Sequence, residues 1–200
     1  MKKLDLKMTE SNRERMAMPT EPEDAGRAPR QGAVTSLLVD AFERVHESVP
    51  AVLDGLSVDE VLWRPDRDAN SIGWLIWHLA RVQDSHLSDL VDAEQVWDAG
   101  WSQRFPLPYE PSAIGYGQTS QQVGMFTLDD LSLLTGYCDA VQTTTRDILI
   151  ALEGEDLHRV IDDSWDPPVT LGVRLVSVVN DITQHIGQAA YVKGLVERRR

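Results

Sequence analysis

Four long stretches of the chain carry apolar residues at the 3.6-residue period of an α-helix. They cover about residues 35–53, 71–93, 127–152 and 170–197. The alternation of apolar and polar residues that is typical of half-buried strands is weak throughout the chain. Because amphipathic helices must bury their apolar faces against one another, this pattern predicts an all-α fold, a four-helix bundle.

Two long connections join these helices. Residues 98–126, between the second helix and the third, contain three prolines and four glycines, which predicts a long crossover rather than a helix. A loop of this length in a compact domain is often functional, as a lid or a binding loop, although a packed connector is the alternative. Residues 153–169 form the second predicted loop, and it contains Trp165.

The start of the chain differs from the rest in composition. Residues 1–31 are polar, mixed in charge and interrupted by Pro19, Pro22 and Pro29, which predicts a disordered tail. Residues 32–200 are long enough for one domain with a substantial core. The organisation predicted is therefore a tail, 1–31, followed by one helical-bundle domain, 32–200.

The charge and the cysteine content exclude several classes of function. The net charge of −13, from 19 basic and 32 acidic residues, would repel a phosphate backbone, so we expect no nucleic-acid partner. No apolar run reaches the length of a membrane span, and we expect no membrane partner. Cys138 is the only cysteine, which fits a reducing cytoplasm and leaves His, Asp and Glu as the available metal ligands.

Asp181 and His185 lie four residues apart in the fourth helix, and so share one of its faces. The apolar residues around them predict that this helix is largely buried. A carboxylate and an imidazole facing the core require a partner, which is either a metal ion or the hydrogen bond between the two. The sequence around this pair leaves both readings open.

His78 has apolar neighbours on the second helix, which places it at or near the core. Bundles build metal sites from inward side chains on facing helices, so His78, Asp181 and His185 form a candidate ligand set. Three protein ligands are typical of catalytic zinc, whereas structural zinc usually has four. Two nitrogens and one oxygen also suit iron, nickel or manganese.

Two segments resemble the DinB-like superfamily. Residues 71–84, SIGWLIWHLARVQD, resemble its second-helix signature, and residues 181–194, DITQHIGQAAYVKG, resemble its fourth-helix signature. Trp97 and the sequence GYGQT at 115–119 are similar to the actinobacterial branch of mycothiol transferases. The resemblance covers about residues 33–197.

This resemblance implies a bundle with a long crossover between helices two and three, and a divalent metal, usually zinc or nickel, held by His78, Asp181 and His185. It also implies a low-molecular-weight thiol such as mycothiol or bacillithiol as co-substrate, and a homodimer. Two residues depart from the family pattern. In the family, the first of the two metal ligands on the fourth helix is often His or Glu, whereas this chain has Asp181. Asp181 would therefore either bind the metal or orient another ligand. A histidine often stands where this chain has Gln118, so activity could have been lost.

The function expected from these residues is a metal-dependent transferase in which the thiol attacks a small electrophile beneath the 98–126 loop. A metal-bound thiol would lose its proton and become the nucleophile. Trp74, with Trp77 and Trp101, would line an apolar pocket, or pack in the core. Arg81 would bind a carboxylate of the thiol or the substrate, or lie solvated on the helix surface. A non-catalytic binding bundle and a metal-dependent hydrolase are the competing functions.

Overall fold

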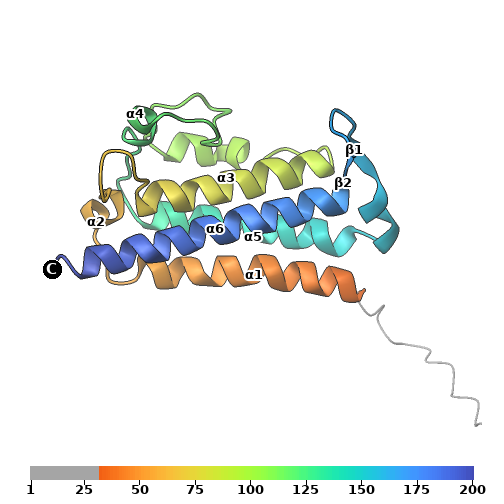
Figure 1. The fold of residues 1–200 in the computed structure, drawn as a ribbon, viewed down its shortest axis with the longest axis horizontal. Coiled ribbons are helices and arrows are strands. Elements are labelled where there is room, and N and C mark those ends of the chain that lie inside the picture. The colour runs from red at the N-terminus through yellow and green to blue at the C-terminus, as the bar shows by residue number, and fades with distance from the viewer. Residues whose placement is uncertain (1–31) are drawn as a thin grey trace, which may run out of the picture. The chain divides into compact units, whose positions relative to one another are not determined.

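Four long helices make up most of the structure, a computed structural model that describes residues 32–200 (Figure 1). The predicted tail, 1–31, lies outside the described residues. The helices are α1 (Ala33–Leu53), α3 (Ile72–Leu90), α5 (Ser132–Ala151) and α6 (Leu171–Glu197). The expectation of an all-α four-helix bundle is confirmed.

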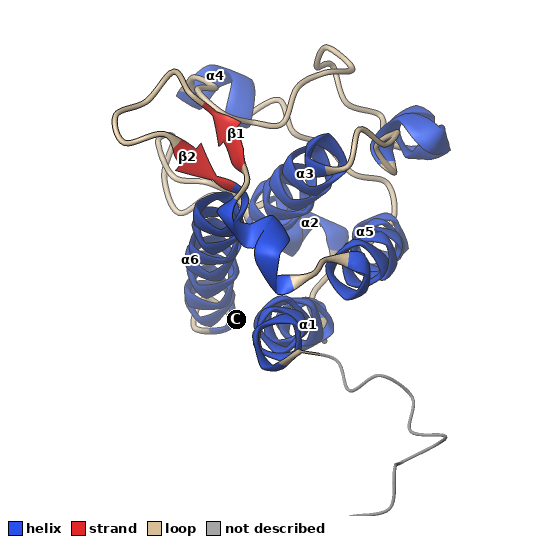
Figure 2. Cartoon of the chain, turned by 90° about the vertical axis from the view of Figure 1, so that its right-hand side faces the viewer, coloured by secondary structure: helices blue, strands red, loops and turns tan. Residues whose placement is uncertain are grey.

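The bundle is closed by contacts between neighbouring helices. Helix α3 packs against α5 and α6, and α1 packs against the same two helices from the other side. Seen end-on, α1 and α3 therefore stand on opposite corners of the bundle (Figure 2). The core between them is formed by fully buried side chains from all four helices, among them Phe42, Leu75, Trp77, Leu134, Tyr137, Leu175 and Ile182.

Helices α3 and α5 run in the same direction, as Figure 1 shows. Parallel neighbours cannot be joined by a tight turn, because the chain must first return along the length of the bundle. Residues 91–131 make this return and contain short turns at Trp97–Trp101 and Ser102–Arg104 and the helix α4 (Ser120–Val123). The predicted crossover between the second and third long helices is therefore present, and it covers one side of α3.

Side-chain caps begin two of the long helices. Ser71 accepts a hydrogen bond from the Trp74 backbone N–H, and Thr170 accepts one from Val173, so each satisfies an otherwise free donor of the first turn. The short helix α2 (Val58–Leu62) opens with a capping box, in which Ser57 and Glu60 bond reciprocally.

The predicted start of the third long helix, at residues 127–130, was too early. Helix α5 begins at Ser132, whose backbone N–H bonds the Asp130 carboxylate. Phe126 and Leu128 are buried in the core while the chain is still irregular, and this anchoring delays the helix. The second long helix ends earlier than expected, at Leu90, ahead of Asp92 with its positive φ of 52°.

The second loop is more ordered than the sequence suggested. It contains a short turn of helix at Gly154–His158 and two antiparallel strands, β1 (Val160–Asp162) and β2 (Val169–Thr170). The strands lie at the end of the bundle where α6 begins (Figure 1). They hold the Trp165 loop beside the first turns of α6.

Helix α6 is buried on one face only, so the expectation of a largely buried helix was wrong. Leu175, Val178 and Ile182 face α1 and α3, whereas Val173 and Val176 are more than half exposed. Its β-branched residues were read as core, but several of them lie on the solvent side. None of the helices within residues 32–200 is long and apolar enough to cross a membrane.

Candidate metal centre

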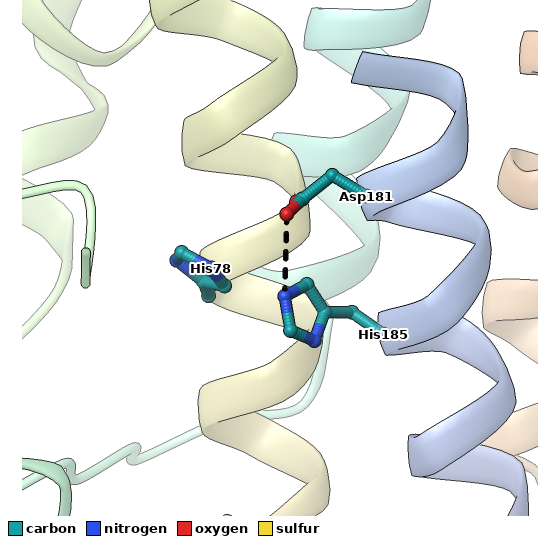
Figure 3. Close-up of side chains that lie close together, drawn as sticks. All are labelled: His78, Asp181 and His185. Atoms are coloured by element: carbon teal, nitrogen blue, oxygen red, sulfur yellow. Dashed lines mark ion pairs between the residues drawn. The ribbon is translucent and has the colours of Figure 1, made fainter. Parts of the chain in front are cut away.

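His78 from α3 and the pair Asp181 and His185 from α6 converge between the two helices (Figure 3). One potential ligand atom from each residue lies within 4.8 Å of the other two. The rings of His78 and His185 meet edge to face, with centroids 4.7 Å apart. Among residues 32–200, these are the only three His, Cys, Asp or Glu side chains that gather in this way.

A backbone carbonyl of the crossover fixes the orientation of His78. The Ile114 oxygen lies at hydrogen-bond distance from His78 Nδ1. Because a carbonyl oxygen can only accept, Nδ1 carries the proton and Nε2 keeps a free lone pair. A hydrogen bond of this kind on the far nitrogen is what orients histidine ligands in metal proteins.

Gly115 allows the crossover to approach His78 this closely. Its φ of +94° is one that residues with a side chain rarely adopt. A Cβ at this position would lie 2.6 Å from His78 Nδ1 and 3.0 Å from a ring carbon of Trp74. Glycine is therefore required both for the backbone conformation and for the space.

His185 is oriented in the same manner by a residue of its own helix. Its Nδ1 lies 3.0 Å from the side-chain amide oxygen of Gln188, Oε1, so Nδ1 donates and Nε2 again keeps a lone pair. That Nε2 stands 3.6 Å from Asp181 Oδ1. The other carboxylate oxygen of Asp181, Oδ2, is buried and makes no hydrogen bond within residues 32–200.

The site shifts the pKa values of its three groups differently. Burial lowers the pKa of His78, and the Ile114 carbonyl opposes this only in part. Contact with the His185 imidazole lowers the pKa of Asp181. Burial also lowers the pKa of His185, but its contacts with Asp181 and Gln188 outweigh that effect and raise the pKa above its usual value. His78 is therefore neutral and Asp181 ionised at neutral pH.

These residues fit a divalent cation. Two imidazole lone pairs and a carboxylate face one another, and the buried Asp181 oxygen lacks a partner, an arrangement that costs free energy without a positive charge between them. Ligands bound to zinc at about 2.0–2.1 Å stand roughly 3.3 Å apart in a tetrahedron. The present separations, of up to 4.8 Å, are wider than this value.

An apolar cleft of about 480 Å³ opens beside the centre. Its size is typical of a site for a small molecule. His78 and Asp181 lie at one end of it, and Arg174 and His86 line it as well. The remaining walls come from α3, α6, the crossover and the second loop, through Val82, Ile114, Tyr116, Trp165, Val169, Val173, Ser177 and Val178.

Two exposed aromatic residues belong to this cleft, and sequence reasoning did not assign them to it. Tyr116 is 89% exposed and Trp165 66%, although large aromatic side chains are normally buried. Trp165 was visible in the sequence as an isolated tryptophan in a polar loop. The second loop therefore contributes to the cleft, together with the crossover that was expected to cover the substrate.

Trp74, Trp77 and Trp101 were expected either to line an apolar pocket or to pack in the core. Trp74 and Trp77 are buried in the core, and in the described part of the chain none of the three lines the cleft. Trp74 stacks on His78, with ring centroids 4.7 Å apart, and its Nε1 donates to Gln118 Oε1 at 2.8 Å. Both Trp74 and Gln118 therefore support the back of the His78 ring.

Arg81 was expected to bind a ligand carboxylate or to lie in solvent. It does not lie in solvent, because its side chain is 1% exposed and its Nε and Nη1 bond groups within the protein. The guanidinium bonds the Ala113 carbonyl, Gln95 and Tyr137, and it contacts Asp84 at 3.4 Å. Arg81 thus ties the crossover to α3 one residue before the Ile114 carbonyl that orients His78.

The fold and the centre together define a DinB-like protein, a four-helix bundle in which a histidine of the second long helix meets a pair of residues four apart on the last. The mycothiol S-transferase family matches residues 37–197, and the chain belongs to this family. A conserved protein from Enterococcus faecalis has a similar crystal structure, with 33% identity over 82% of this chain and 96% of that one, and a TM-score of 0.78. No curated protein matches the sequence.

Proposed function

We propose that this protein is a metal-dependent transferase that joins the sulfur of a low-molecular-weight thiol, of the mycothiol type, to a small electrophile. The observation that carries the proposal is the convergence of His78, Asp181 and His185 at the end of an apolar cleft. Membership of the mycothiol S-transferase family supports the reaction class.

His78 and His185 would hold the ion through their Nε2 atoms, and Asp181 through its carboxylate. The nitrogen and oxygen donors favour zinc, with nickel, iron and manganese as the other candidates. A bound divalent cation would lower the pKa of a thiol from about 8.5 and so supply a thiolate at neutral pH.

The chain's own residues position the reactants. Ile114 and Gln188 hold the two imidazoles in the orientation that leaves Nε2 free. The apolar walls would keep water away from the electrophile. Water would otherwise compete with the thiol as a nucleophile. The thiol sulfur forms a bond to the electrophilic atom, the leaving group departs with its bonding electrons, and the thiol proton passes to solvent.

Gln118 bears on the alternative of a non-catalytic bundle. It supports Trp74 behind the His78 ring and does not line the cleft. The absence of a histidine at this position therefore leaves the three candidate ligands in place.

The experiment measures metal content and thiol consumption together. The full-length protein, His185→Ala and the control His158→Ala, which changes an exposed histidine of the second loop, are reloaded with zinc and assayed by elemental analysis. Consumption of mycothiol is then followed with 1-chloro-2,4-dinitrobenzene as the electrophile. We expect wild type and His158→Ala to hold metal and accelerate the reaction, and His185→Ala to do neither.

Other outcomes separate the competing functions. Equally low metal in wild type and His185→Ala would refute the centre. Metal binding without acceleration, over a panel of thiols and electrophiles, would indicate a binding protein. Metal-dependent hydrolysis of an activated ester without any thiol would indicate a hydrolase. The homodimer and the physiological metal remain predictions, to be measured by light scattering and by analysis of the protein as isolated.

A further inference from the structure

Arg174 lines the same cleft as the candidate metal centre and lies seven residues before Asp181 on α6. We propose that Arg174 binds a carboxylate at the far end of an electrophile whose body is apolar. This inference names the substrate class of the proposed transferase and in that respect rests on it, although the binding itself requires neither metal nor thiol.

Arg174 is the only Lys or Arg among the residues of 32–200 that line the cleft. Its side chain is 25% exposed, so the charge is partly shielded from water and still reachable. On a largely apolar wall the local dielectric is low, and this strengthens the attraction between a cation and an anionic partner. The charge of Arg174 therefore suits an anionic group of a ligand, and the mostly apolar walls suit the rest of that ligand.

The partners of Arg174 hold the guanidinium without using it up. Its Nη1 lies 3.2 Å from His86 Nδ1, and because a guanidinium can only donate, His86 accepts and is neutral. Its Nη2 faces Asp162 at 3.5 Å, which is longer than a good hydrogen bond. These contacts engage one N–H on each terminal nitrogen, and three of the five N–H groups make no hydrogen bond within residues 32–200.

Asp162 faces Arg174 only through Oδ2, at 3.5 Å, and its other carboxylate oxygen has nearer partners. Its Oδ1 accepts hydrogen bonds from the backbone N–H and the hydroxyl of Ser164, at 3.0 and 2.6 Å. Asp162 therefore belongs to the turn after β1 and approaches Arg174 from the second loop. A neighbouring hollow shares His86 and Arg174 with the cleft and is lined as well by Asp89, Arg159 and Asp162.

The spacing of the two ends sets the length of the ligand. Seven residues of α-helix separate Arg174 from Asp181 by about 10 Å. The exposed rings of Tyr116 and Trp165 border the space between them. An aryl or alkyl carboxylate fits this arrangement, with its reactive atom at the metal centre and its carboxylate at Arg174.

A matched pair of ligands tests the proposal on the metal-free full-length protein. Calorimetry compares 6-phenylhexanoate with the uncharged 6-phenylhexanamide, for wild type, Arg174→Gln, Arg174→Lys and the control Arg146→Gln. Arg146 is an exposed arginine on α5 that pairs with Glu43 and lies outside the cleft. Removal of metal and thiol ensures that failure of the transferase proposal would leave this measurement unaffected.

We expect wild type and Arg146→Gln to bind the acid at least about tenfold more tightly than the amide, the lower range for a hydrogen bond to a charged group. Arg174→Gln should bind both equally, and Arg174→Lys should retain part of the preference. Equal binding of acid and amide by wild type would overturn the proposal, as would an acid preference that survives in Arg174→Gln. If Arg174→Gln does not fold, wild type and Arg174→Lys decide.

A last arm assigns the carboxylate to the electrophile rather than to the thiol. The acid is titrated into zinc-loaded protein in the presence and absence of saturating mycothiol. We expect similar acid affinities in the two titrations, because the ligands occupy different parts of the cleft. Displacement of the acid by mycothiol would overturn the assignment to the electrophile.

Discussion

The packing of Gly115 against His78 leads to a quantitative prediction for Gly115→Ala. The substitution forces a φ of +94° on a residue with a side chain, at a cost of about 1–2 kcal/mol. It also places a Cβ 2.6 Å from His78 Nδ1, so the crossover or the imidazole must move. Such overpacking in a close-packed site adds about 1–3 kcal/mol.

Together these effects destabilise the metal-free protein by about 2–5 kcal/mol, which for a domain of this size lowers Tm by roughly 4–20 °C. Displacement of the crossover also removes the hydrogen bond from His78 to Ile114. Loss of such an orienting partner weakens metal binding about 10- to 100-fold. Both changes arise from one methyl group.

Gly117→Ala is the matched control. Gly117 also has a positive φ, +70°, but no atom lies within 4 Å of the Cβ it would gain. It should therefore lose about 1–2 kcal/mol through backbone strain alone and keep its metal affinity. Calorimetric melting of the metal-free proteins and zinc titration against a competing chelator measure the two effects. If Gly115→Ala matches Gly117→Ala in both assays, the close contact does not hold His78 in place.

Three further outcomes follow from buried groups elsewhere in the domain. Asp84→Asn should lower the free energy of unfolding, measured in urea, by about 3–5 kcal/mol. The buried Asp84 carboxylate accepts hydrogen bonds from two backbone N–H groups and lies beside an arginine, and the substitution removes its charge. A loss below about 1 kcal/mol would refute this. Burial raises the pKa of the Cys138 thiol to about 12, so a disulfide reagent at pH 8 should react with it only after denaturation. Burial and the Arg174 charge lower the pKa of His86 in the folded protein. As the pH falls, His86 is therefore protonated in the unfolded chain before it is protonated in the folded one, and stability should fall below about pH 6.5. His86→Gln should make this pH dependence shallower, and an unchanged slope would contradict the assignment.

Local patterns made much of the fold predictable. The caps at Ser71 and Thr170 and the capping box at Ser57 depend on residues three apart, and these interactions form within one helical turn. The start of α5 was missed because Phe126 and Leu128 are held by tertiary packing, which no local pattern records. The exposed face of α6 was taken for core, because its valines are apolar and the sequence does not show which way their side chains face.

The sequence alone indicated the three candidate ligands, because helical spacing brings Asp181 and His185 to one face and family motifs mark His78. It could not indicate which partner orients His78, because Ile114 and Gly115 reach His78 only through the path of the crossover. It left Arg81 either to bind a ligand or to lie in solvent, whereas the folded chain buries it in a network with Asp84 and Tyr137. Arg174, Tyr116 and Trp165 come from three separate segments, and only the packing of α6, the crossover and the second loop brings them to one cleft. Spacing along a helix is a local property written in the sequence, whereas burial and the grouping of distant side chains are decided by how the elements pack.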